Sequence, residues 1–393
     1  MDMGARAEAL NGCIVKLRRE LHACPEVGHD LPLTEAVVVR ELSRLDLDEI
    51  KTGQGEGHGV FATLKGEKRG RGGTLALRAD MDALPIREET GLPFASANGN
   101  MHACGHDAHM AMLLGAARLL AESRAECSGT VRFIFQPAEE TVRGACSMIE
   151  SGALENPRVD EIVALHTGNL WGSLEPGQIG WRVGPMMASS SFVDILLEGR
   201  GGHGAMPHLA VDSIVMAAEV IAQLQTLVSR ETDPFDPAVV TFGKIEGGTA
   251  HNVVAESCAM RGMIRAFGPE TTEFLKRRVR ETAEGVAASM RGRAAVSISP
   301  GLPAVVNDAG AVSRMRAAVT EALGEKWLRE LARPTAGAED FALYLEKVPG
   351  ALFYHCSMFG DGRDHPHHSP RFDVNESVLW TGAAALAARG ARA

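Results

Sequence analysis

The stretch HDAHMAMLLGAARLLAES, residues 106–123, is apolar on nearly every side and long enough to form a buried helix. It lies between two short apolar runs, TLALRA at 74–79 and VRFIFQ at 131–136, which have the length and composition of strands. Strands rich in Val, Ile, Leu and Phe that alternate with helices are typical of a mainly parallel sheet covered by helices on both faces. The sequence therefore predicts an α/β fold, with further strands at 59–64 and 162–166.

The order of elements changes after about Gly184. A strand, a helix, two strands, a helix and a strand follow one another up to residue 301, an order that suits a small ferredoxin-like α+β domain. From residue 302 the α/β pattern returns, with ALFYHC (351–356) as a strand. We therefore predict one discontinuous domain, 1–183 and 302–393, interrupted by an inserted domain at 184–301.

Length and charge narrow the class of protein. A chain of 393 residues is too long for one ordinary core, which agrees with two domains. The net charge of −10, without a long basic block, argues against nucleic acid as a partner. The N-terminal residues have no signal-peptide pattern and no apolar run reaches membrane-helix length, so we expect a cytoplasmic protein without a membrane partner. Seven scattered cysteines do not resemble a disulfide framework.

Polar clusters follow three of the predicted strands. They are RADMDALP (78–85), QPAEE (136–140) and LHTGN (165–169). Two more, HACGHDAH (102–109) and HPHHSPRFD (365–373), lie just before the buried helix and in the returning segment. Ligands of open α/β sheets bind outside the carboxyl ends of the strands. We therefore expect these clusters to converge.

Cys104 and His106 are separated only by Gly105, a small residue that lets a loop turn both side chains toward one ion. A thiolate and an imidazole suit zinc or another transition metal. The alternative is a reduced structural cysteine beside a histidine that caps the helix. Asp107 has the same two interpretations, as a functional group or as a helix cap.

Glu139 and Glu140 are adjacent carboxylates at the end of a strand, and they point in different directions. One can bind a divalent ion while the other, as a base, reaches the water that the ion acidifies. The cation would also remove the repulsion between them. The alternative is an exposed acidic turn. Three histidines, His166, His367 and His368, are further candidates, although such residues are also common as hydrogen-bonding or surface groups.

Eight motifs occur together in one order: ELHACPE, LALRADMDALPI, HACGHDAH, FQPAEE, GGHGAMPH, HNVV, GAEDF and HHSPRFD. In this order they resemble the N-acyl-amino-acid amidohydrolases. These include hippurate hydrolases, auxin-conjugate hydrolases and aminoacylase-like enzymes, within the dinuclear aminoacylase/carboxypeptidase metallopeptidases. The resemblance extends from about residue 10 to 390.

The resemblance implies two divalent metal ions per subunit, with zinc, manganese, nickel or cobalt all compatible with the ligands. By motif, Glu139 resembles the general base and Asp82 the aspartate that orients a ligand. His368 is preferred to His367 because the family ligand stands two residues before the proline. Asp80 occupies the place of a ligating histidine in the wider superfamily. The implied metal ligands are Cys104, His106, Glu140, His166 and His368.

The resemblance also makes 184–301 a lid that dimerises, so we expect a homodimer. His203 resembles the histidine that reaches the partner's active site and stabilises the oxyanion. Asn252 and Arg265 match positions that hold the substrate carboxylate, which an arginine can bind with two hydrogen bonds. A surface turn around His203 and an exposed strand residue at 265 are the alternatives.

The implied reaction is hydrolysis of small N-acyl-L-amino acids to a carboxylic acid and an amino acid. The rivals are a dipeptidase or carboxypeptidase on the same scaffold, and a non-catalytic metal-binding relative. Two departures from the usual motifs of the family concern the choice of substrate. Thr141, Val142 and Arg143 replace the glycines usual after PAEE, and Asn169 and Ala255 stand where proline is common.

Overall fold

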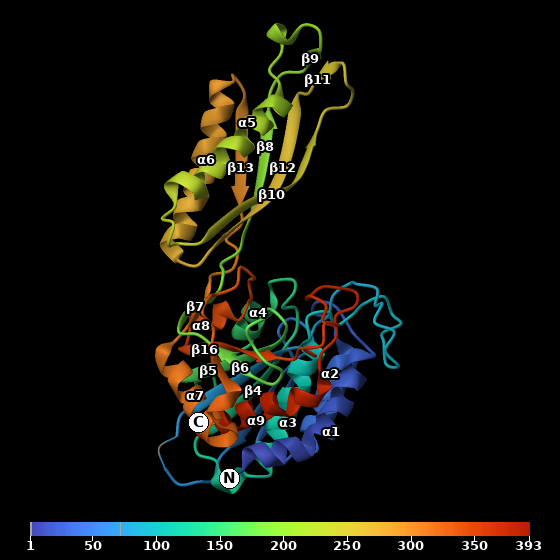
Figure 1. Ribbon diagram of the computed structural model, residues 1–393, viewed down its shortest axis with the longest axis vertical. Coiled ribbons are helices and arrows are strands. Elements are labelled where there is room, and N and C mark those ends of the chain that lie inside the picture. The colour runs from blue at the N-terminus through green and yellow to red at the C-terminus, as the bar shows by residue number, and fades with distance from the viewer. Residues whose placement is uncertain (1, 71) are drawn as a thin grey trace. The chain divides into compact units, whose positions relative to one another are not determined.

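A computed structural model describes residues 2–70 and 72–393. These residues form two compact units (Figure 1). The first contains 2–186, Val306–Pro334 and Glu339–Ala393, and the second contains Met187–Val305 and Thr335–Ala338. Among the helices of the described residues, none combines the length and the apolar character needed to cross a membrane.

The first unit is built on an eight-stranded sheet with the order β1-β2-β4-β3-β5-β16-β6-β15. Its central strands β4, β3, β5 and β16 are parallel, whereas β1, β2 and β4 are joined in antiparallel pairs. The predicted α/β class with a mainly parallel sheet is therefore confirmed. The strands are β1 (Glu49–Gln54), β2 (Gly59–Lys65), β3 (Thr74–Asp80), β4 (Thr130–Gln136), β5 (Glu161–Gly168), β6 (Ile179–Trp181), β15 (Leu328–Glu330) and β16 (Gly350–Cys356), and β7 (Gly184–Met187) pairs separately with β14 (Val305–Asn307).

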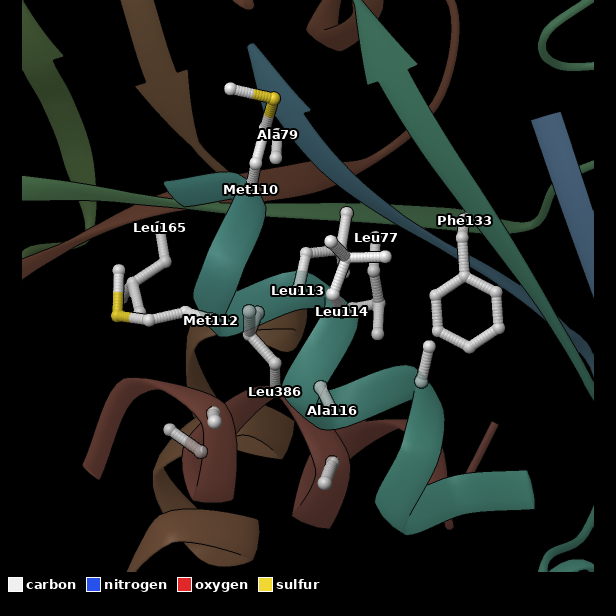
Figure 2. Close-up of a cluster of buried hydrophobic side chains, with 14 of the residues drawn as sticks. Leu77, Ala79, Met110, Met112, Leu113, Leu114, Ala116, Phe133, Leu165 and Leu386 are labelled. Atoms are coloured by element: carbon white, nitrogen blue, oxygen red, sulfur yellow. The ribbon is translucent and has the colours of Figure 1, made fainter. Parts of the chain in front are cut away.

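Helix α3 (His106–Ala121) is the predicted buried helix, and it packs against β3, α1 and α9. Figure 2 shows its side chain Met110 beside Ala79 of β3, and Leu113 and Leu114 beside Leu77 of the same strand. A helix surrounded in this way must be apolar on every side, which explains the composition of residues 106–123. The other helices of this unit are α1 (Met3–His22), α2 (Pro32–Leu42), α4 (Gly144–Glu150), α7 (Ala309–Leu323), α8 (Ala342–Leu345) and α9 (Leu379–Gly390).

The second unit has two helices on one face of a four-stranded antiparallel sheet (Figure 1). The sheet order β10-β12-β8-β13 is that of a ferredoxin-like βαββαβ unit. Along β8 the side chains alternate between buried and exposed, because only one face of the sheet is covered. The elements are β8 (Ser191–Glu198), β9 (Gly202–His203), α5 (Ser213–Thr226), β10 (Ala238–Gly247), β11 (Val253–Val254), β12 (Ser257–Ala266), α6 (Pro269–Ser289) and β13 (Arg293–Ile298).

Candidate metal centre and active site

Neighbouring strands of the large sheet bring the polar clusters to one edge. In the register of the parallel strands β3 and β4, Asp80 lies opposite Gln136, and β5 carries His166 on the other side of β3. Gly105 precedes α3 with φ of +87°, and a Cβ there would lie 3.0 Å from Thr167 Cγ2. Glycine thus lets the Cys104 loop approach β5 closely.

The five histidine, cysteine and glutamate side chains predicted as metal ligands come together in this unit. Two groups of candidate ligand atoms, each with members within 4.8 Å of one another, share the Cys104 sulfur. Sulfur and nitrogen donors with one carboxylate suit divalent transition metals. The groups are Cys104 with His106 and His166, and Cys104 with Glu140 and His368.

Two atoms in these groups are buried and unpaired. His106 donates its Nδ1 hydrogen to the Asp82 carbonyl over 2.8 Å, so the neutral form of the ring presents its lone pair on Nε2. Within the described residues, neither His106 Nε2 nor Glu140 Oε1 has a hydrogen-bond partner. Buried polar atoms without partners are costly, and a cation between them would satisfy both. The arrangement therefore fits a metal ion.

His166, like His106, directs its Nε2 toward the candidate metal ligands. Its Nδ1 donates to the Thr167 carbonyl over 3.0 Å, and its Nε2 lies 3.6 Å from Cys104 Sγ. Burial holds the pKa of His166 well below its usual value, so the ring stays neutral and can bind a metal. Hydrogen bonds through the second ring nitrogen are the usual way in which proteins orient a ligating histidine.

Asp82 is fully buried and holds the turn that contains both glutamates. Its two carboxylate oxygens accept the backbone N–H groups of Glu139 at 3.0 Å and Glu140 at 3.2 Å. The role expected for Asp82 was to orient a ligand. In the structure it contacts the backbone of the candidate base as well as that of the candidate ligand.

The two glutamates differ in their electrostatic surroundings. Burial, followed by the carboxylates of Glu339 and Glu140, raises the pKa of Glu139 well above its ordinary value. Burial would also raise the pKa of Glu140, but the nearby His368 and His106 hold it below the usual value. One carboxylate is thus suited to carry a proton and its neighbour to remain ionised.

Arg78 is a site residue that the sequence did not single out. Its guanidinium, 2% exposed, donates to Asp80 at 2.7 Å and to Gln136 at 2.9 Å. It also donates to Glu339 at 3.0 Å and Asp340 at 2.9 Å. The N–H of Asp340 in turn points to Glu139 Oε1 over 3.4 Å. A charged residue inside the apolar strand TLALRA was the available signal, since such a residue needs buried partners.

His109 lies within 4.8 Å of Asp80 and His106 in a further group of possible ligands. Both of its ring nitrogens are already used, however. Nδ1 is 2.5 Å from Asp80 Oδ1, and Nε2 accepts the Thr167 N–H at 2.7 Å. His109 therefore holds Asp80 and is not free to bind a metal.

The adjacent histidines of HHSPRF point to different neighbours. His368 Nε2 lies 3.5 Å from Glu140 Oε1, whereas His367 Nδ1 lies 3.6 Å from Cys104 Sγ. His368, which the motif favours over His367 as a metal ligand, belongs to the candidate ligand group with Cys104 and Glu140. Burial lowers the pKa of His367 to about 3.

His203, Asn252 and Arg265 belong to the second unit, so their action on the first unit's cluster stays a prediction. His203 pairs with Val253 between β9 and β11, next to Asn252. His203 Nδ1 accepts the Ala205 N–H at 3.1 Å. On β12, Arg265 has a buried Nη1 that finds no partner in the described part of the chain.

Comparison with known proteins gives consistent matches over nearly the whole chain. Peptidase family M20/M25/M40 matches residues 76–389. N-acetylcysteine deacetylase of Bacillus subtilis is 39% identical over 95% of this chain and 94% of its own length. IAA-amino acid hydrolase ILR1-like 2 of Arabidopsis thaliana is 38% identical over 94% and 83%.

A solved structure shows the same architecture. The YXEP protein of Bacillus subtilis, described as a dinuclear metal-binding peptidase of the M20 family, is 35% identical and superposes with a TM-score of 0.83 over 98% of both chains. With the cysteine, histidine and glutamate donors gathered at the sheet edge, these matches show that the chain belongs to peptidase family M20/M25/M40.

Proposed function

We propose that this chain hydrolyses the amide bond of small N-acyl-L-amino acids, releasing a carboxylic acid and an amino acid. The observation that carries the proposal is the pair of candidate ligand groups that share Cys104, with the buried Glu139 beside them. Relatives named as an N-acetylcysteine deacetylase and an IAA-amino acid hydrolase support this class of substrate.

Two divalent ions per chain would be held by the five donors named above, of which Cys104 serves both groups. When bound, such ions polarise the scissile carbonyl and acidify a water molecule. Zinc, manganese, nickel and cobalt all accept this mixture of sulfur, nitrogen and oxygen ligands.

Glu139 is the proposed general base. In its ionised form it would accept a proton from the attacking water, and burial, which raises its pKa, would help it to hold that proton until it is delivered to the departing amine. Asp82 and Asp340 fix its place, because they bind its backbone N–H and its Oε1. A carboxylate held on both sides needs little reorganisation when the proton moves.

Residues 184–301 are the proposed lid, which would supply donors to the substrate. Because His203 Nδ1 accepts the Ala205 N–H, the neutral ring carries its proton on Nε2 and can donate it to the oxyanion. The unpaired Nη1 of Arg265 is available for the substrate carboxylate, and Asn252 would assist it. A homodimer is part of the proposal, since exposed Phe192, Leu196 and Val239 offer apolar surface that a second copy could cover.

The test is a panel of N-acetyl, N-benzoyl and indolyl-acyl amino acids beside dipeptides, assayed on metal-free protein with each ion restored in turn. We expect turnover of the acyl-amino acids only after an ion is added. Glu139→Gln should keep its metal content and lose about 100-fold or more in turnover. Preference for dipeptides, or full activity of Glu139→Gln, would contradict the proposal.

A further inference from the structure

His367 is a half-buried histidine to which the proposed reaction gives no role. Its ring centroid lies 4.8 Å from that of Phe372 and 5.4 Å from that of His166. Gly168 leaves room for it, because a Cβ at that position would lie 2.0 Å from His367 Nε2. The ring is therefore confined by its neighbours.

Two donors point at His367 Nε2. The backbone N–H of Asn169 is directed to it over 3.4 Å, and the Tyr354 hydroxyl lies 3.0 Å away. That hydroxyl already accepts the N–H of Leu170 at 2.8 Å, so its own hydrogen is available for the ring. Nε2 must hold a lone pair to receive them, and the ring hydrogen is then on Nδ1.

Nδ1 faces sulfur. It lies 3.6 Å from Cys104 Sγ, a distance at which the large sulfur atom accepts a hydrogen bond. An N–H directed at sulfur stabilises the thiolate, which is the metal-binding form of cysteine. A proline at position 169 would have no N–H for Nε2, so Asn169 contributes to this arrangement through its backbone.

We propose that His367 is a positioning residue that donates its Nδ1 hydrogen to the Cys104 thiolate and so fixes the sulfur shared by the two ligand groups. The inference rests on the proposed role of Cys104 as a metal ligand. It predicts that loss of this donor weakens metal binding by about 10–100-fold, the usual effect of removing a partner of a ligand.

The experiment uses Co²⁺ alone as the probe on the full metal-free chain. The thiolate-to-cobalt charge-transfer band reports the sulfur, and a competition titration gives the affinity. In His367→Asn the amide nitrogen can take the place of Nδ1, whereas in His367→Gln it takes the place of Nε2. We expect the Asn variant to resemble the wild type, and the Gln variant to show a band at lower energy and weaker binding. Cys104→Ala is the control that removes the band.

Each other outcome overturns the inference in a recognisable way. An unchanged band and affinity in His367→Gln would show that the histidine does not act on the sulfur. Loss of one bound ion in both variants would make His367 a ligand. Absence of the band in the wild type would remove Cys104 from the ligands, and with it part of the proposed function. If His367→Gln does not fold, Tyr354→Phe should shift the band in the same direction, and no shift there would also overturn the inference.

Discussion

Replacement of Arg78 by leucine should destabilise the first unit severely. The guanidinium contacts the carboxylates of Asp80, Glu339 and Asp340, and all three side chains are buried. Leucine fills much of the same volume but cannot pair with a charge. The variant therefore leaves buried carboxylates without a counter-charge.

The magnitude follows from this pairing. Removal of one partner of a buried ion pair costs about 3–5 kcal/mol, because the remaining charge is neither solvated nor paired. Glu339 and Asp340 both pair with Arg78 through the same nitrogen, Nη2, so the substitution removes the ion pair of each carboxylate. With a urea dependence of about 2 kcal/mol per molar, the unfolding midpoint should fall by roughly 2 M.

The assay is urea unfolding followed by tryptophan fluorescence. The four tryptophans, Trp171, Trp181, Trp327 and Trp380, all lie in the first unit, so the signal reports that unit. The matched control is Arg118→Leu on α3. Arg118 forms an exposed pair with Glu122 one helical turn away, which contributes about 0.5 kcal/mol or less.

If Arg78→Leu shifted the midpoint no more than Arg118→Leu, the guanidinium would not be the counter-charge of this cluster. Turnover should also fall in Arg78→Leu, because Asp340 would lose the charged one of the partners that hold it beside Glu139. A variant that unfolds earlier yet hydrolyses substrate at the full rate when folded would show that Arg78 stabilises the fold without positioning the base.

Three further predictions concern the dimer, a backbone turn and pH. The inactive variants His203→Ala and Glu139→Gln should regain partial activity in mixed dimers when they are mixed under conditions of subunit exchange. Exchange without recovery of activity would show that His203 does not act in the active site of a second chain. Val142 has φ of +63°, a backbone conformation that glycine adopts without strain. In urea denaturation the free energy of unfolding should therefore be about 1 kcal/mol higher for Val142→Gly than for Val142→Ala. The reverse order would show that the backbone at residue 142 is not strained. Burial lowers the pKa of His355 to about 4, so below pH 6.5 the unfolded chain binds a proton that the folded chain does not. His355 should therefore contribute about 3 kcal/mol to the fall in the free energy of unfolding between pH 6.5 and 4. The fall should be smaller by this amount in His355→Gln, and equal slopes in the two proteins would contradict the prediction.

The sequence was most informative where local pattern and topology act together. An apolar run such as residues 106–123 has few solutions other than a buried helix, and the parallel strands β3 and β4 necessarily end at one edge. Convergence of the predicted ligands followed from that edge. Strand direction was less accessible, because β2 is buried on both faces and would have the same composition in a parallel or an antiparallel pair.

The partners of the site residues were beyond the sequence for a physical reason. Arg78 and Glu339 are 261 residues apart, and nothing in local composition specifies that they meet. The role of His367 depends on hydrogen positions set by Asn169 and Tyr354, which are properties of packing. Motifs identified the kinds of donor in the centre, whereas the hydrogen bonds that orient those donors required coordinates.

The network around Asp80 explains how an acidic residue can stand where the wider superfamily has a ligating histidine. One of its oxygens is bound to His109 Nδ1 and the other to Arg78, so its negative charge is balanced within the protein. Arg78 also contacts the buried carboxylates of Glu339 and Asp340, so Asp80 belongs to a network of buried charges that is held together by this guanidinium. Asp80 and Arg78 therefore act as a pair, since either one without the other would change that balance.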